Sequence, residues 1–223
     1  FLTGGTLRDE AAVAMANIAL ALAGSQPDVS AQALKELEAT GLSDAARKRI
    51  AEVRELIDKF QGFIATWEFA GPYSEPADGY DAVFEYAYPP ETDQAGQVNW
   101  LPLRSATPGN PYVFDLNGVA DCGNCAIYAR AAIWSETARP VRLEIGSDDG
   151  VQVWLNGERV HSHAGVRGHS LGADKVDVQL NTGWNTVMLK VAQAAGGWEF
   201  SCGVRSRKDA PLKGLRFAAE APE

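Results

Sequence analysis

The sequence of 223 residues has few of the features that mark membrane or nucleic-acid-binding proteins. No run approaches the ~18 consecutive apolar residues of a membrane-spanning helix. Basic residues are also scarce, with 20 Lys and Arg against 29 Asp and Glu, and the formal net charge is −9. A nucleic-acid or anionic-membrane partner needs clustered positive charge, so this balance argues against both.

Recognisable catalytic motifs are lacking too. The sequence contains no H-E-x-x-H zinc motif, no phosphate-binding P-loop and no dinucleotide-binding G-x-G-x-x-G. Carboxylates are plentiful, but no motif singles out an acid–base pair. The first residues, F-L-T-G-G, include neither an initiator Met nor the start of a signal peptide, which predicts a piece of a longer protein.

Tryptophan is absent from the first quarter of the chain, and proline is rare there. Residues 8–60 are rich in Ala, Leu, Glu, Lys and Arg and contain one proline, Pro27, whereas all six Trp follow residue 63. The first composition favours helix and the second favours strand. We therefore predict a helical segment over residues 1–62 and a β domain over residues 63–223.

Three helices are predicted in the first part, over residues 8–23, 30–40 and 43–60. Ser30 and Ser43 are the predicted N-caps of the last two, because a serine hydroxyl can accept a hydrogen bond from the first helical turn. Helices joined by short turns are similar to the last units of a HEAT-type repeat. The alternative is a helical cap on the β domain.

The second part consists of short runs of alternating apolar and polar residues between turn signals. Nine such runs are predicted as strands, at residues 63–69, 81–88, 98–103, 126–134, 141–146, 151–157, 175–180, 185–192 and 198–205. Many short strands without intervening helices indicate an antiparallel sandwich. The predicted fold class is mainly β with N-terminal α-helices, an antiparallel β-sandwich plus a short helical segment.

The most specific motif is G-S-D-D-G-V-Q-V-W-L-N-G-E-R-V-H-S-H-A-G (146–165), followed by N-T-G-W-N-T-V-M-L-K-V (181–191). It resembles the galactose-binding-like jelly-roll modules, in particular the sugar-binding domain of family 2 glycoside hydrolases, and its S-D-D-G turn resembles PA14-type domains. The resemblance covers about residues 63–205. It implies an accessory carbohydrate-binding module, since no room remains for the catalytic barrel of a family 2 enzyme.

The paired aspartates are the candidate metal ligands. The resemblance to PA14-type domains implies Ca²⁺ at Asp148 and Asp149 beside a sugar. Ca²⁺ takes roughly six to eight oxygen ligands, of which two adjacent carboxylates supply only a part. The alternative is a turn in which aspartate caps its own backbone. No other cofactor is expected.

Tryptophan rings are candidate platforms for sugars, whose C–H groups pack on aromatic faces. Trp154, Trp184 and Trp198 could serve, and Trp198, which follows two glycines, is expected to be the most exposed. The alternative is that they belong to the core, as we expect for Trp67 and Trp100.

Polar contacts to a sugar are expected from the loops around these tryptophans. Asn156 lies in an N-G turn, where the alternative role is simply the positive φ of a type I′ turn. His161, His163, Arg167 and His169 follow in one short stretch. They are candidate ligand-binding residues, and the alternative is a polar loop over the sheet.

Three cysteines leave the pairing open. Cys122 and Cys125 form a C-x-x-C, and Cys202 stands apart. The candidates are a disulfide between Cys202 and either of the others, a short Cys122–Cys125 bridge, or a zinc site with a loop histidine. A disulfide is favoured if the protein is exported.

The predicted function is a noncatalytic carbohydrate-binding module of a larger, extracellular or periplasmic protein, whose partners are carbohydrate and the other domains of its polypeptide. One alternative is a protein-interaction or architectural module, with an apolar patch on the helices around Leu34, Leu37 and Leu56. A second is a carbohydrate-active enzyme domain of an unrecognised type.

Overall fold

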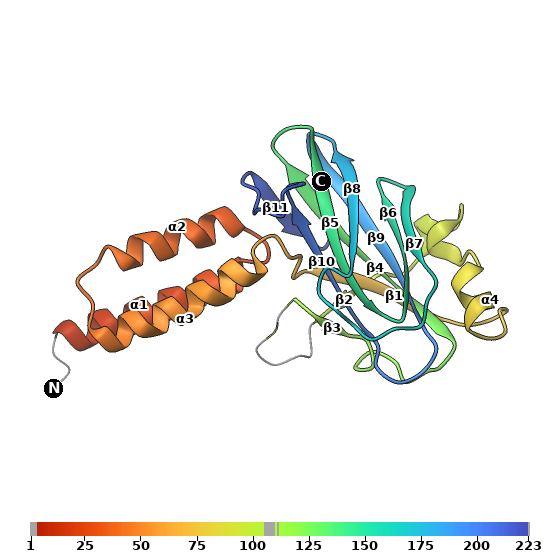
Figure 1. Ribbon diagram of the computed structural model, residues 1–223, viewed down its shortest axis with the longest axis horizontal. Coiled ribbons are helices and arrows are strands. Elements are labelled where there is room, and N and C mark those ends of the chain that lie inside the picture. The colour runs from red at the N-terminus through yellow and green to blue at the C-terminus, as the bar shows by residue number, and fades with distance from the viewer. Residues whose placement is uncertain (1–3, 105–109, 111, 223) are drawn as a thin grey trace.

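The computed structural model describes residues 4–104, 110 and 112–222 as three helices beside a two-layer β-sandwich (Figure 1). The helices are α1 (Gly4–Leu22), α2 (Pro27–Glu38) and α3 (Asp44–Phe60). They pack on one another around a core of their own, which includes Ala16, Leu34 and Val53. No helix among the described residues is long and apolar enough to cross a membrane.

One of the two predicted N-cap serines caps its helix, and the other has a different role. Ser43 is the N-cap of α3, and its hydroxyl accepts a hydrogen bond from the backbone N–H of Ala46 at 3.3 Å, as predicted. Ser30 is not an N-cap, because α2 begins three residues earlier at Pro27, whose fixed φ suits a first helical position. The buried Ser30 hydroxyl instead donates to the carbonyl oxygen of Ala19 at 2.7 Å, which ties α2 to α1.

Two antiparallel sheets form the sandwich and confirm the predicted fold class. The larger sheet has the order β2-β1-β4-β9-β6-β7, with β11 also paired to β4, and the smaller has the order β3-β10-β5-β8. The strands of the larger sheet are β1 (Trp67–Tyr73), β2 (Leu101–Leu103), β4 (Cys125–Ser135), β6 (Gly150–Leu155), β7 (Glu158–His163), β9 (Gly183–Gln193) and β11 (Leu215–Ala218). Those of the smaller sheet are β3 (Phe114–Asp115), β5 (Arg139–Asp148), β8 (Asp174–Leu180) and β10 (Glu199–Arg205).

The main core lies between the two sheets. Because side chains alternate along a strand, Val151, Val153 and Leu155 of β6 point into it, and Gln152 and Trp154 point to the outer face of the larger sheet.

One predicted strand is a helix. Residues 81–88 contribute to α4 (Tyr80–Glu85), which with the short 3-10 helices η1 (Pro89–Glu91) and η2 (Ala95–Gln97) covers one end of the outer face (Figure 1). Val83 and Phe84 of α4 are buried against Ala126 and Tyr128 of β4. The mixture of apolar and polar residues over 81–88 is typical of a strand, but it also fits a short helix that buries two adjacent residues.

Candidate binding site

The predicted loop site is held together by Asp149. This side chain is 2% exposed, and its two oxygens accept the backbone N–H groups of Arg167, at 3.0 Å, and Ala194, at 2.8 Å. It thereby joins the loop after β7 to the loop after β9. Such bonds are the usual way to satisfy a buried carboxylate, and they describe a structural role.

Asp148 differs from its neighbour. Burial, together with the negative charges of Asp149 and Glu199, raises the pKa of Asp148 to about 6. A calcium ion here would have to rely on Asp148 and its surroundings, because both oxygens of Asp149 already accept N–H groups. No group of three or more His, Cys, Asp or Glu side chains placed to hold a metal ion occurs among the described residues. The geometry fits the turn interpretation, and calcium stays a prediction.

The His–Arg loop is brought together as predicted, but its groups face one another. The guanidinium of Arg167 donates to both oxygens of Asp174, and also to the hydroxyl of Ser147 at 2.7 Å. Burial alone would raise the pKa of Asp174, but the hydrogen bonds and charge of Arg167 outweigh it and lower that pKa. His161 lies against the same carboxylate at 3.4 Å. These side chains fasten the loop to β8.

His169 and His163 complete the loop. The Nε2 atom of His169 lies 2.9 Å from the hydroxyl of Ser201, and burial followed by the charge of Arg167 lowers the pKa of His169. His163 folds back over Gly165. The alternative of a polar loop over the sheet therefore describes this stretch better than an open recognition surface.

The candidate tryptophans of the loops are not exposed. Trp198 is 0% exposed and its indole N–H donates to the carbonyl oxygen of Val191 at 3.3 Å, so its prediction as an exposed platform is wrong. The two glycines before it turn the chain back into the core. Trp154, 8% exposed, lies on the outer face but packs 6.4 Å from the ring of Tyr128. Its faces are covered.

Asn156 also has a structural role. Its φ is +52° in the turn between β6 and β7, and its side-chain oxygen accepts the backbone N–H of Thr186 at 2.9 Å. Its amide donates to the side chain of Asn185 at 2.9 Å. The turn is thus bonded to the neighbouring strand β9, which leaves this amide little freedom for a ligand.

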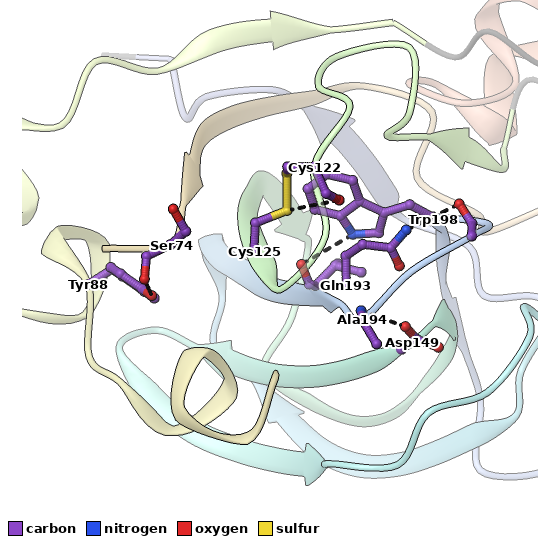
Figure 2. Close-up of a disulfide and its surroundings, with 10 residues drawn as sticks. Ser74, Tyr88, Cys122, Cys125, Asp149, Gln193, Ala194 and Trp198 are labelled. Carbon is purple, nitrogen blue, oxygen red and sulfur yellow. Dashed lines mark hydrogen bonds between the residues drawn. A yellow bond between two sulfur atoms is a disulfide. The ribbon is translucent and has the colours of Figure 1, made fainter. Parts of the chain in front are cut away.

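The cysteines adopt the short-bridge alternative. Cys122 and Cys125 form a disulfide at the start of β4, beside the loop that carries Ala194 (Figure 2). Cys202 is free and fully buried, and burial raises its pKa to about 12. A bridge to Cys202 and a zinc site built on the C-x-x-C are therefore both wrong for this structure.

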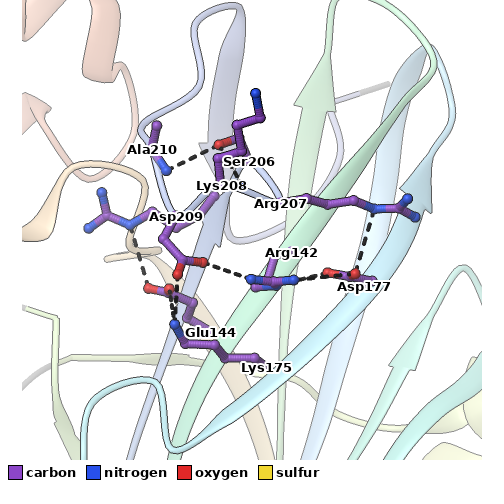
Figure 3. Close-up of polar contacts among 10 residues, drawn as sticks. Arg142, Glu144, Lys175, Asp177, Ser206, Arg207, Lys208, Asp209 and Ala210 are labelled. Atoms are coloured by element: carbon purple, nitrogen blue, oxygen red, sulfur yellow. Dashed lines mark hydrogen bonds and ion pairs between the residues drawn. The ribbon is translucent and has the colours of Figure 1, made fainter.

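The outer face of the smaller sheet is occupied by ion pairs (Figure 3). Arg142 pairs with Asp177 at 2.8 Å and with Asp209 at 2.9 Å. Lys175 pairs with Asp209 at 2.9 Å and with Glu144 at 3.7 Å. Each charge has a partner of opposite sign, so this face offers little unpaired charge to a ligand.

Two partly exposed tryptophans lie instead on the outer face of the larger sheet, at the end nearest the helices. Trp134 of β4 and Trp184 of β9 are register partners, with ring centroids 5.5 Å apart, and both are partly exposed. The guanidinium of Arg216, on β11, lies 4.5 Å from the centre of the Trp134 ring. We call these three side chains the tryptophan pair and its arginine.

Trp134 of the tryptophan pair lines an open hollow of about 380 Å³ between α2 and β11, and Trp184 stands beside Trp134. Trp134, Glu136 and Arg216 line it from the sandwich. Gln26 and Asp28 line it from the helices, and Asp28 holds the two parts together by accepting the backbone N–H of Gly214 at 2.7 Å. The hollow combines one aromatic wall with amide, carboxylate and guanidinium groups, and its volume suits a small ligand.

Sequence reasoning named Trp184 among three candidates and did not name Trp134. The available signal was strand alternation, which puts Trp134 on the same face of β4 as Arg130 and Tyr128. The approach of α2 to β11, which makes the hollow, joins residues almost 190 positions apart and left no pattern in the sequence.

Two local features resemble those of hydrolases, and neither is placed to act as in a hydrolase. Residues 168–172, G-H-S-L-G, have the G-x-S-x-G spacing of a nucleophile elbow, but they lie in the β7–β8 loop and precede a strand, whereas an elbow joins a strand to a helix. The contact between His169 and Ser201 has the chemistry of a nucleophile and its base, yet Ser201 is 0% exposed. A substrate has no access to its hydroxyl.

No family model and no curated protein matches the sequence. Among solved structures, the PA14 domain of the MpAFP antifreeze protein matches 72% of this chain and 93% of that chain, with a TM-score of 0.40 and 13% identity. The PA14 sugar-binding domain from an RTX adhesin matches 65% and 92%, with a TM-score of 0.41 and 17% identity. The epithelial adhesin 9 A domain from Candida glabrata, in complex with Galb1-3GlcNAc, matches 72% of this chain and 92% of that chain, with a TM-score of 0.41 and 9% identity. The similar solved structures thus include two domains of the PA14 type.

Proposed function

We propose that this chain is a noncatalytic carbohydrate-binding module and that it binds sugar at the hollow beside the tryptophan pair. The observation that carries the proposal is a hollow lined by hydrogen-bonding groups and by the partly exposed indole of Trp134, with the partly exposed indole of Trp184 packed beside it. Pyranose rings combine apolar C–H faces with hydroxyl edges, and this arrangement offers a partner to each.

Recognition would divide between the two sides of the hollow. A sugar ring stacks on the tryptophan pair, while Arg216 donates hydrogen bonds and Glu136 accepts them. Gln26 can do both from the helical side. Because the strands β4 and β9 hold both indoles in register, the platform is set before the ligand arrives, which keeps the entropic cost of binding low.

The proposed setting is extracellular or periplasmic. The Cys122–Cys125 disulfide supports it, since disulfides persist mainly in oxidising compartments. Its partners would be a glycan and the other domains of the same polypeptide.

The experiment is a glycan array followed by calorimetry on the best ligand. Trp134→Ala should weaken binding about 10-fold, the value of one lost aromatic stack. Trp100→Ala is the matched control, because Trp100 is also partly exposed and also has a guanidinium over its ring, that of Arg130 at 4.6 Å, but it lies outside the hollow. The proposal is wrong if no glycan binds, or if both variants bind like the parent.

The interaction alternative is favoured by one observation, on a different helix face from the one expected. Leu34 and Leu37 are buried inside the helical bundle, so the predicted patch there is wrong. Three of the exposed apolar residues lie on α1 instead: the exposed fractions of Leu7, Met15 and Ile18 are 53%, 51% and 59%. Residues 11–22 carry no charge, so the same face of a second copy would not be repelled. Sedimentation velocity tests this, and self-association that Ile18→Lys does not abolish would contradict it.

A further inference from the structure

A second hollow, of about 420 Å³, lies at the opposite end of the larger sheet. The chain between β1 and β2, which includes α4, folds over the sheet there (Figure 1). Tyr73, Tyr86 and Tyr88 form its aromatic part, and Glu75 and Asp93 lie among its other lining residues. We call it the tyrosine cup.

The aromatic part of the cup is held rigidly. The rings of Tyr73 and Tyr88 are stacked with centroids 5.2 Å apart, and Tyr86 is tilted against Tyr88 at 4.8 Å. Tyr88 is 1% exposed, and its hydroxyl donates to the carbonyl oxygen of Ser74 at 2.8 Å. Tyr86 is 42% exposed and is the ring most open to a ligand. The cup needs little rearrangement to receive one.

The charge of the cup is negative. Glu75 and Asp93 are exposed, and within the described part of the chain neither takes part in an ion pair. The residues that line the cup, all of them described, include no Lys, Arg or His. Burial raises the pKa of Tyr88, and the charges of Tyr86 and Glu75 add to the effect, so the field of this carboxylate reaches the ring.

The lysine behind the cup is already neutralised. Lys190 lies behind the cup, 5.1 Å from the centre of the Tyr88 ring, but it is fully buried and pairs with Glu91 at 3.3 Å. It therefore does not compensate the carboxylates at the mouth of the cup. An aromatic face with uncompensated carboxylates beside it attracts positive charge.

We propose that the tyrosine cup binds a small organic cation, either a protonated amine or a quaternary ammonium group. The rings of Tyr73 and Tyr86 would meet the cation, and Glu75 and Asp93 would supply the opposite charge. A bare metal ion is a poorer fit, since two exposed carboxylates provide few of the oxygens that it requires. This site is separate from the proposed sugar site and does not depend on it.

The first test compares charge at constant shape. Choline and 3,3-dimethylbutan-1-ol are nearly isosteric, and only choline is charged. Titration followed by NMR should show choline binding with a Kd on the order of 1 mM, weakened by added salt, and no binding of the neutral alcohol at about 50 mM. Equal binding of the two, or no binding of any amine, would overturn the proposal.

A second pair separates the two amine sources. Glucosamine carries a protonated amine, and N-acetylglucosamine carries a neutral amide on the same ring. Binding of glucosamine and not of its acetylated form supports a protonated amine, and binding of choline alone supports a quaternary group. Binding of N-acetylglucosamine as tight as that of glucosamine at this cup contradicts the proposal.

Variants locate the binding. Tyr86→Leu should weaken binding about 3- to 5-fold and Tyr86→Phe should not, because only the first removes the aromatic face. Glu75→Gln with Asp93→Asn should weaken it about 10-fold at low salt. Glu158→Gln, an exposed carboxylate on β7, is the control. All these residues are exposed, so the variants should fold, and unchanged affinity in both sets would refute the assignment.

Discussion

Replacing Lys190 by Met should loosen the segment that covers one end of the larger sheet. The Nζ atom of Lys190 donates to the carbonyl oxygens of Phe84, at 2.8 Å, and Tyr86, at 2.6 Å, and lies 3.3 Å from Glu91. Phe84 lies at the C-terminal end of α4, and Tyr86 is the residue that follows the helix. A lysine of β9 thus caps α4 and fixes it to the sheet.

The expected magnitude follows from what the replacement leaves behind. Met retains the volume, but Glu91, whose side chain is 11% exposed, then keeps only the hydroxyl of Tyr128 as a donor among the described residues. The carbonyl oxygens of Phe84 and Tyr86 lose the donor that Lys190 supplied. Breaking a buried ion pair on one side costs about 3–5 kcal/mol. Burial lowers the pKa of Lys190, so removing its charge also relieves a desolvation cost. We therefore expect a loss of about 3 kcal/mol, at the lower end of that range.

Urea unfolding followed by tryptophan fluorescence measures this loss in the sandwich alone, because all six Trp lie beyond residue 63. Combining Lys190→Met with Glu91→Gln should cost less than the sum of the single changes by about 1–2 kcal/mol, since the two groups are in contact. Lys175→Met, at a lysine that is 46% exposed, should have a much smaller effect. A loss below about 1 kcal/mol for Lys190→Met, or strict additivity, would refute the reasoning.

Three further predictions concern the region around the loops. Reduction of the disulfide between Cys122 and Cys125 should lower the unfolding free energy by about 2 kcal/mol, the chain-entropy value for so short a loop. After reduction, thiol labelling should modify these two cysteines, and it should not modify the buried Cys202 until the protein unfolds. Folding lowers the pKa of His169 below 6.5, so stability should be lost as the pH falls below that value. His169→Gln should flatten this part of a plot of melting temperature against pH, and an unchanged slope would contradict the prediction. Folding raises the pKa of Asp148 from 3.8 to about 6, so its contribution should be lost as the pH rises through this window, and Asp148→Asn should stabilise the protein at pH 7 by about 1 kcal/mol after allowance for solvent screening. A calcium ion at Asp148 would reverse that sign, which melting curves in EDTA and in excess Ca²⁺ would reveal.

The sandwich could be predicted because its strands and turns have local sequence patterns. The alternation in residues 151–155 and the turn at Asn156 each depend on neighbours a few positions away, and both are found in the structure. The error at α4 has the opposite origin. Val83 and Phe84 are apolar because the sheet lies beneath them, and only the tertiary fold distinguishes a helical turn from a strand there.

The binding surface could not be predicted to the same extent, because exposure is set by the fold. Trp198 follows two glycines, which suggested an open loop, yet it fills the core, whereas Trp134 ends an apolar run and is partly exposed. Among the polar residues between 148 and 169, Asn156 lies at the far end of β6 from Asp149, while His161 and Arg167 meet at one carboxylate. Whether they faced a ligand or each other depended on Asp174, a residue of β8 that no motif had singled out.

The two proposed sites lie on one face and share the strand pair of β4 and β9. The tryptophan pair is at Trp134 and Trp184, and the tyrosine cup covers the region of Ala126 and Ala192, eight residues further along each strand. At about 3.3 Å per residue the sites are ~26 Å apart. A short ligand therefore occupies one site without affecting the other, so the two sets of variants should act independently. A glycan chain that carries amino groups and exceeds this span could reach both, and its second contact would then be intramolecular, with an affinity well above that of either fragment.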